Sequence, residues 1–208
     1  LDLPISGAPS ADIDSSTTIN TVALLGPDYV GLKPTMLVKE GDTVSCGQKL
    51  FEDKKNPGIF IAAPSSGVVQ SINRGEKRRF LSLIIEVDDS VESQTFNRAD
   101  YDSSLGLLAD SGTLSYFKTR PYNRIPGINE SPDAIFVNAC DTNPLAVDPH
   151  LLIEKEQELF NAGLTFISSI NADAKTFCAF QNNDFDQSVP DINYNQFNGP
   201  HPAGLTGT

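Results

Sequence analysis

The chain has 208 residues, of which 39% are hydrophobic, and its 27 acidic against 15 basic residues give a formal net charge of −12. A chain of this length and composition can bury a core, so it is not a disordered segment. The acid excess argues against nucleic acid as its main partner. The three cysteines form no Cys-x-x-Cys pair, which excludes the usual zinc and iron–sulfur spacings.

The longest apolar run, Ile59–Ala63, is far shorter than the roughly 20 residues that a membrane-spanning helix needs. The start at Leu1 without Met, and the stop at Thr208 directly after a Gly- and Pro-rich turn, indicate a piece of a longer protein. We therefore expect no transmembrane segment within this piece.

Charge is unevenly distributed along the chain. Residues 1–79 contain nine bases and nine acids, whereas residues 80–208 contain six bases and eighteen acids. Between Lys33 and Arg79, nine bases stand against five acids. Such a segment is either a solvated surface of mixed charge or a basic face that docks a partner or an anionic membrane.

Residues 1–100 are predicted to form an all-β domain. Short apolar stretches alternate with turn signals rich in Gly, Pro and Asn, a pattern typical of a small barrel or sandwich. The predicted strands are Val22–Leu25, Met36–Lys39, Lys49–Asp53, Gly58–Ala62, Val68–Ile72 and Leu81–Val87.

Residues 101–133 are predicted to be a helical and loop connection. The apolar spacing within Ser104–Lys118 indicates two short helices, which Ser111 and Gly112 separate. The following segment up to Gly127 contains two prolines, and the residue before a proline is disfavoured in helical geometry. We expect an extended loop there.

Residues 134–208 are predicted to begin a Rossmann-like α/β domain, so that the whole chain is of the α+β or α/β class. Ala134–Ala139 is a continuous apolar strand of the kind that is buried in a parallel sheet. A helix is expected to begin at Pro149, with Asp148 as its cap, and to end before Gly163. The remaining predictions are a helix over Leu164–Ile170 and strands at Thr176–Phe180 and Ile192–Phe197.

One local motif resembles the biotinyl- and lipoyl-carrier fold. Its first half is Val38–Leu50, which reads V-x-x-G-D-x-V-x-x-G-Q-x-L, and its second half is Pro64–Val69. The glycines permit tight turns and the valines fill a small flattened barrel. Lys54 and Lys55 follow the first half too closely to match the acylated lysine of true carriers. The favoured interpretation is a carrier-like fold without its prosthetic group.

Several sequence blocks, taken in order, resemble one family more specifically than any single motif does. They are residues 1–7 (LDLPISG), 51–58 (FEDKKNPG), 73–78 (NRGEKR), 119–122 (TRPY), 141–146 (DTNPLA) and 201–205 (HPAGL). Together they resemble the A subunits of the bacterial Na⁺-translocating NADH:quinone reductases, and the resemblance extends over essentially the whole chain.

This resemblance implies a peripheral subunit on the cytoplasmic face of the bacterial inner membrane, in a complex that passes electrons from NADH to ubiquinone and exports Na⁺. Its partners would be the other subunits, the membrane subunits above all. The flavins and the iron–sulfur centre would belong to those subunits, so no tightly bound cofactor, metal or catalytic residue is expected here. The fragment alone is expected to be inactive. The family is also similar to the flavin subunit of complex I, with a Rossmann-like domain that lacks flavin.

A contact with ubiquinone as substrate is the site hypothesis that follows. A quinone headgroup requires an apolar slot, an aromatic face and a donor for each carbonyl. Two loops offer such groups: Tyr29, Val30, Gly31 and Leu32 in one, and Arg120, Pro121 and Tyr122 in the other. The competing interpretation of both loops is ordinary loop packing.

Two other classes of function remain open from the sequence. The first is the related C subunit of the Rnf-type electron-transport complexes, which shares the carrier-like and Rossmann-like parts. That family has ferredoxin-type cysteine clusters further along, so residues beyond Thr208 would decide. The second is a carrier-like scaffold module without redox chemistry. Mass measurement of the expressed protein would reveal any lipoyl or biotinyl adduct.

Overall fold

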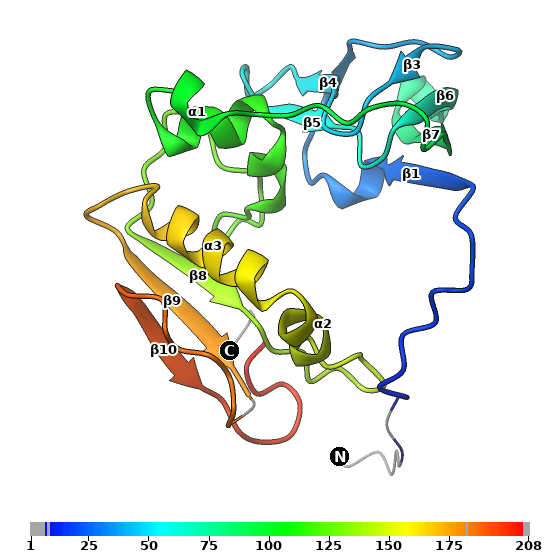
Figure 1. The fold of residues 1–208 in the computed structure, drawn as a ribbon. Helices are drawn as coiled ribbons and strands as arrows, with labels where there is room; N and C mark the ends of the chain where they lie inside the picture. The colour runs from blue at the N-terminus through cyan, green and yellow to red at the C-terminus, as the bar shows by residue number, and fades with distance from the viewer. Residues whose placement is uncertain (1–6, 8, 182, 206–208) are drawn as a thin grey trace. The chain divides into compact units, whose positions relative to one another are not determined.

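The computed structural model describes residue 7, residues 9–181 and residues 183–205 (Figure 1). Most of the first sequence block, residues 1–6, lies outside the described residues. The chain divides into two compact units, Ser16–Glu130 and a second unit formed by the described parts of Leu1–Ser15 and Ser131–Thr208. The strands and helices are β1 (Thr21–Leu25), η1 (Gly26–Asp28), β2 (Pro34–Met36), β3 (Thr43–Val44), β4 (Lys49–Asp53), β5 (Phe60–Ala62), β6 (Gly67–Arg74), η2 (Glu76–Arg78), β7 (Phe80–Val87), η3 (Arg98–Asp100), α1 (Ser104–Asp110), η4 (Thr113–Tyr116), β8 (Ala134–Asn138), α2 (His150–Lys155), α3 (Gln157–Ser168), β9 (Lys175–Phe180) and β10 (Ile192–Gln196).

The Ser16–Glu130 unit contains two antiparallel sheets. One has the strand order β1-β7-β6-β3 and the other the order β2-β4-β5. The strands β6 and β7 form a long hairpin that pairs from Gly67 opposite Val87 to Arg74 opposite Phe80. This pair of small sheets confirms the barrel-like sandwich that the sequence predicts.

The core of this unit depends on a local irregularity in β4. Leu50 and Phe51 are neighbours in the sequence, yet both are fully buried, although successive side chains of a regular strand point to opposite faces. The pairing of β4 with β5 shifts register between Lys49 and Phe51, which marks a bulge at this point. Each large side chain buried in this way contributes about 1.5–3 kcal/mol to folding.

In this unit one predicted strand is displaced and one observed strand was missed. The predicted strand Met36–Lys39 is displaced toward the N-terminus, because the backbone N–H of Lys39 donates to the Asp42 carboxylate at 2.9 Å and closes a turn there. The short strand β3 was not predicted. It has only two residues, paired with Val68 and Gly67, and so carries no period that a sequence could reveal.

The helical segment α1–η4 also lies within the Ser16–Glu130 unit and confirms the two predicted short helices. The Ser103 hydroxyl accepts a hydrogen bond from the Gly106 N–H at 3.0 Å and so caps α1. Leu108 and Leu114 are buried. Asp110 at the end of α1 forms an ion pair with Lys49 of β4, which ties the segment to the barrel.

The second unit contains a parallel sheet with the strand order β10-β9-β8, and α3 lies along it (Figure 1). The sheet confirms the α/β prediction. Gly163 does not end the helix: α3 continues to Ser168, which also confirms helix rather than strand at the start of Leu164–Ile170. The helical conformation is interrupted instead at Glu156, between α2 and α3.

The strand β8 is less buried than its apolar sequence predicts. Ile135 is buried, but Phe136 is 72% exposed and stacks on Phe177 of β9, with ring centroids 5.1 Å apart. Within the described residues, therefore, only one face of this strand faces a core.

No helix in the described part of the chain is long and apolar enough to cross a membrane.

Candidate functional site

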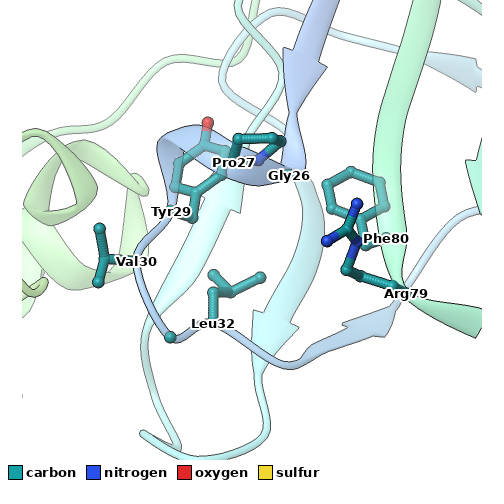
Figure 2. Close-up of a pocket in the computed structure, with 8 residues that line it drawn as sticks. Gly26, Pro27, Tyr29, Val30, Leu32, Arg79 and Phe80 are labelled. Atoms are coloured by element: carbon teal, nitrogen blue, oxygen red, sulfur yellow. The ribbon is translucent and has the colours of Figure 1, made fainter. Parts of the chain in front are cut away.

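An apolar pocket lies in the Ser16–Glu130 unit, between the turn after β1 and the start of β7 (Figure 2). Its volume is about 300 Å³, at the lower end of the range of about 300–1,000 Å³ that is usual for ligand pockets. In Figure 2, Val30 and Leu32 lie on one side of it, and Arg79 and Phe80 on the other. The lining residues are Gly26, Pro27, Tyr29, Val30, Gly31, Leu32, Arg79 and Phe80.

The turn after β1 is built by short-range hydrogen bonds. The N–H of Tyr29 donates to the carbonyl of Gly26 at 3.2 Å, and the N–H of Leu32 donates to that of Tyr29 at 3.2 Å. Gly26 is required by close packing, because a Cβ at this position would lie 2.3 Å from the carbonyl oxygen of Phe80. The absence of a side chain thus lets the turn approach β7, and the pocket forms between them.

Tyr29 forms the aromatic wall of the pocket. Its ring stands edge-on to the buried ring of Phe51, with centroids 6.0 Å apart. Burial, and then the nearby Tyr116 and Asp28, raise the pKa of Tyr29 to about 12, so its hydroxyl is protonated at neutral pH. Figure 2 shows the Tyr29 oxygen at the end of the ring remote from Leu32. The wall is therefore anchored in the core, and its hydroxyl points away from the apolar end.

Three cationic side chains lie around this pocket. Arg79 lines the pocket with an exposed side chain. The Lys55 ammonium donates to the Gly31 carbonyl at 2.7 Å and so holds the turn. The Lys118 ammonium lies 5.9 Å from the centroid of the Tyr29 ring, and its burial lowers the pKa of Lys118. An apolar slot with cations at its edge suits a ligand that has an apolar body and electron-rich oxygens.

Of the two loops that the sequence singles out, the structure brings one to this pocket. Tyr29, Val30, Gly31 and Leu32 all line it. Arg120, Pro121 and Tyr122 line neither this pocket nor the second one described below, and Tyr122 is 74% exposed. They occupy a turn closed by two backbone hydrogen bonds, from Thr119 N–H to the Arg124 carbonyl at 2.8 Å and from Asn123 N–H to the Thr119 carbonyl at 2.7 Å.

Four lining residues were not anticipated from the sequence: Gly26, Pro27, Arg79 and Phe80. Arg79 belongs to the basic stretch that ends the Lys33–Arg79 segment, and this excess of charge was the one available signal. Phe80 and Gly26 come together only through the pairing of β1 with β7, which aligns Leu25 with Ser82. A long-range pairing of this kind has no local signature in the sequence.

A second pocket of about 380 Å³ lies in the same unit, and Tyr29 lines it too. It is more polar, and Asp28, Cys46, Ser111, Thr113 and Tyr116 are among its lining residues. Tyr116 and Asp28 are the two groups that, besides burial, raise the pKa of Tyr29. Among the described residues, no cluster of three or more His, Cys, Asp or Glu side chains could hold a metal ion.

Comparisons with known proteins match both parts of the chain. The family described as the NqrA N-terminal barrel-sandwich hybrid domain matches residues 1–88. The family described as the NqrA second alpha/beta domain matches residues 102–208. The first match covers the carrier-like barrel, and the second covers α1, η4 and the parallel sheet.

Curated relatives are similar over the full chain. It is 43% identical over 216 residues to the A subunit of the Na⁺-translocating NADH-quinone reductase of Yersinia pseudotuberculosis serotype O:1b. It is 44% identical over 221 residues to the A subunit from Photorhabdus laumondii, and 43% over 219 residues to that from Glaesserella parasuis serovar 5. All of the chain is covered, but only 48–49% of each relative, so the chain spans about half their length. The chain belongs to the family of the A subunits of Na⁺-translocating NADH-quinone reductases.

Proposed function

We propose that this chain is the N-terminal half of a subunit that works within a Na⁺-translocating NADH:ubiquinone oxidoreductase. In this proposal the subunit is peripheral, lies on the cytoplasmic face of the membrane and docks on the membrane subunits. It contributes to ubiquinone reduction and to assembly of the complex. The observation that supports the proposal is the identity of 43% over the whole chain to relatives that bear this name.

The apolar pocket beside Tyr29 is the proposed contact for ubiquinone. The Tyr29 ring offers a rigid aromatic face, and Val30 and Leu32 supply the apolar side of the slot. In this proposal the Arg79 guanidinium, which lines the pocket, donates a hydrogen bond to a quinone carbonyl. Because the pocket residues include no acid, cysteine or histidine, the proposed role is binding and orientation, with proton and electron transfer left to other subunits.

The test is the substitution Tyr29→Ala in the assembled complex. Loss of one such contact typically costs about 1–3 kcal/mol, which corresponds to a rise of about 5- to 150-fold in the apparent KM for ubiquinone. NADH oxidation by an artificial acceptor that takes electrons upstream should stay near normal. Tyr116→Ala is a matched control, because Tyr116 is exposed and lines only the second pocket.

The outcomes separate binding from scaffolding. If both activities of the Tyr29→Ala complex fall together, the turn is structural. If neither changes, the quinone binds elsewhere and the chain is a docking scaffold.

We also propose that this subunit holds no flavin or iron–sulfur centre of its own. The three cysteines are isolated in sequence, and no phosphate-binding glycine motif follows a strand. The purified 208-residue chain should therefore be colourless in the visible range. A stoichiometric flavin absorbance band would contradict this part of the proposal.

A further inference from the structure

The hairpin between β6 and β7 presents an unusual concentration of positive charge. Arg74, Lys77, Arg78 and Arg79 are all exposed, in a chain whose net charge is −12. The turn is closed by a hydrogen bond from Gly75 N–H to the Arg79 carbonyl at 2.8 Å. The four charges are thus held together at one tip of the barrel.

Three more bases lie in turns that contact the pocket residue Gly31 or adjoin it in sequence. The N–H of Lys54 donates to the Lys33 carbonyl at 2.9 Å, and the backbone N–H groups of Lys33 and Lys55 both donate to the Asp53 carboxylate at 3.1 Å. These contacts join the turn after β4 to the turn that contains Gly31. We call the seven bases the basic rim: Lys33, Lys54, Lys55, Arg74, Lys77, Arg78 and Arg79.

The basic rim is not neutralised within the described part of the chain. The ion pairs found there involve Lys49, Arg124 and His150, and none of them includes a rim residue. Three acids belong to the same turns, Asp28, Asp53 and Glu76, so seven bases less three acids leave a local excess of four positive charges. One of these acids, Asp53, is already occupied by the two backbone N–H groups.

Exposed aliphatic side chains lie close in the chain to these bases, and Val30 belongs to the turn that the Lys55 ammonium holds through the Gly31 carbonyl. Val30 is 54% exposed and lines the pocket (Figure 2), and Leu25, the last residue of β1, is 46% exposed. Clusters of four to eight Lys and Arg residues next to apolar side chains are the pattern that binds anionic phospholipid surfaces. Exposed apolar side chains next to bases that have no ion pair among the described residues match both layers of such a surface, the headgroups and the acyl boundary.

We propose that the face of the Ser16–Glu130 unit that bears the basic rim docks on an anionic phospholipid bilayer, with Val30 at the interface. The inference rests on the proposed function in one respect, since ubiquinone dissolves in the bilayer and a quinone pocket would have to open toward it. The charge and exposure that support the proposal stand without the quinone.

The experiment is flotation of the purified full-length protein with vesicles that contain no quinone. Vesicles of phosphatidylcholine are compared with vesicles that also contain phosphatidylglycerol, at low and at physiological salt. Wild type is expected to float with the anionic vesicles only, and less so as salt increases. Binding to neither vesicle, or to both equally, would overturn the proposal.

Two variants locate the surface. Each base near an anionic surface changes the partition about fivefold, so Lys77→Gln combined with Arg78→Gln should weaken binding about 25-fold. The matched control, Lys155→Gln combined with Lys175→Gln, removes the same charge from exposed positions in the other unit and should leave binding nearly unchanged. If both pairs weaken binding equally, net charge and not this face is responsible, and the proposal fails.

Three further outcomes are informative. Val30→Ser should weaken the binding that remains at physiological salt, because the apolar contact is not screened. If wild type ignores vesicles while the Lys77 and Arg78 variant dissociates from the complex, the face docks an acidic protein surface, which overturns the lipid proposal. If wild type floats with the anionic vesicles while Tyr29→Ala leaves the apparent KM for ubiquinone unchanged, only the proposed function is overturned.

Discussion

The ring of Tyr29 meets the ring of Phe51 edge-on, with centroids 6.0 Å apart and planes at 87°. Phe51 is fully buried and contacts the ring of Phe80 at 5.2 Å between centroids. One wall of the pocket therefore rests on the barrel core, and Phe80 serves both the core and the opposite wall. The pocket is preorganised by the same side chains that stabilise the fold.

This relationship predicts that the ring of Tyr29 matters more than its hydroxyl. Tyr29→Phe keeps the aromatic wall and its contact with Phe51, and it removes a hydroxyl that points away from Leu32. In the assembled complex we expect the apparent KM for ubiquinone to change little in Tyr29→Phe and to rise strongly in Tyr29→Ala. Equal effects of the two substitutions on this KM would show that the hydroxyl itself contacts the quinone.

The loop that contains Arg120, Pro121 and Tyr122 can be tested without disturbing the fold, because Tyr122 is exposed. Tyr122 is 74% exposed, so Tyr122→Ala should change the free energy of unfolding by no more than about 0.5 kcal/mol. We expect this loop to meet the quinone in the assembled complex. In that case Tyr122→Ala and Arg120→Ala should raise the apparent KM for ubiquinone. Unchanged steady-state kinetics in both variants would restrict the contact to the Tyr29–Leu32 turn.

The ion pair between Lys49 and Asp110 predicts a pH dependence of stability. Hydrogen bonds from Lys49, and then from Tyr101 at 2.6 Å, lower the pKa of Asp110. Because the native pKa is below the unfolded value of about 3.9, the stabilisation is complete above that value and is lost as pH falls through the native pKa. Asp110→Asn should therefore destabilise the protein near neutral pH and lose this effect in acid.

Urea unfolding of the full-length protein between about pH 3 and pH 7 measures this difference. Tyr101 adds a second window: its hydrogen bond to Asp110 raises the pKa of Tyr101 to about 12, so its contribution is present below about 10 and is lost between these values. Glu92→Gln, at an exposed carboxylate, is the control. A pH-independent effect of Asp110→Asn would mean that its carboxylate is not specifically stabilised.

The sequence predicted those features of the fold that have a local pattern. Strand β4 was placed at its observed bounds, because Lys49–Asp53 lies between two clear turn signals. Part of what the sequence did not predict has a cause outside the local pattern. The burial of both neighbours Leu50 and Phe51 depends on a bulge in the pairing of β4 with β5. Gly163 does not end its helix, because α3 is supported by packing on β9. Residue type was enough to single out the Tyr29–Leu32 turn. The opposite wall of the pocket, Arg79 and Phe80, depends on the pairing of β1 with β7.

Gly163 in the interior of α3 predicts a stabilising substitution. A Cβ built at this position meets nothing within 4 Å, so alanine fits without a clash. Gly163→Ala should raise the free energy of unfolding by about 0.5–1 kcal/mol, because glycine has a low helix propensity. By contrast, Gly112 has φ +74° and a Cβ there would lie 2.7 Å from the Cβ of Ala62. Gly112→Ala should destabilise, and thermal melts that rank the two variants otherwise would contradict the local geometry.

The three cysteines should differ sharply in reactivity. Cys178 is fully buried in β9, and burial, followed by the neighbouring Cys140, raises the pKa of Cys178 to about 11. Burial also raises the pKa of Cys140. Because the thiolate is the reactive form and a raised pKa keeps a thiol protonated, neither should react appreciably at about pH 8 in the native state.

Cys46 provides the internal reference for this test, because it is only partly buried and lines the second pocket. The native full-length protein is treated with iodoacetamide at about pH 8, and the labelled peptides are identified by mass spectrometry. Cys46 should be alkylated first, and Cys140 and Cys178 should become reactive only after denaturation in urea. Labelling of Cys178 at the rate of Cys46 would show that the face of the parallel sheet where Cys178 packs against Phe180 and Leu164 opens readily to solvent.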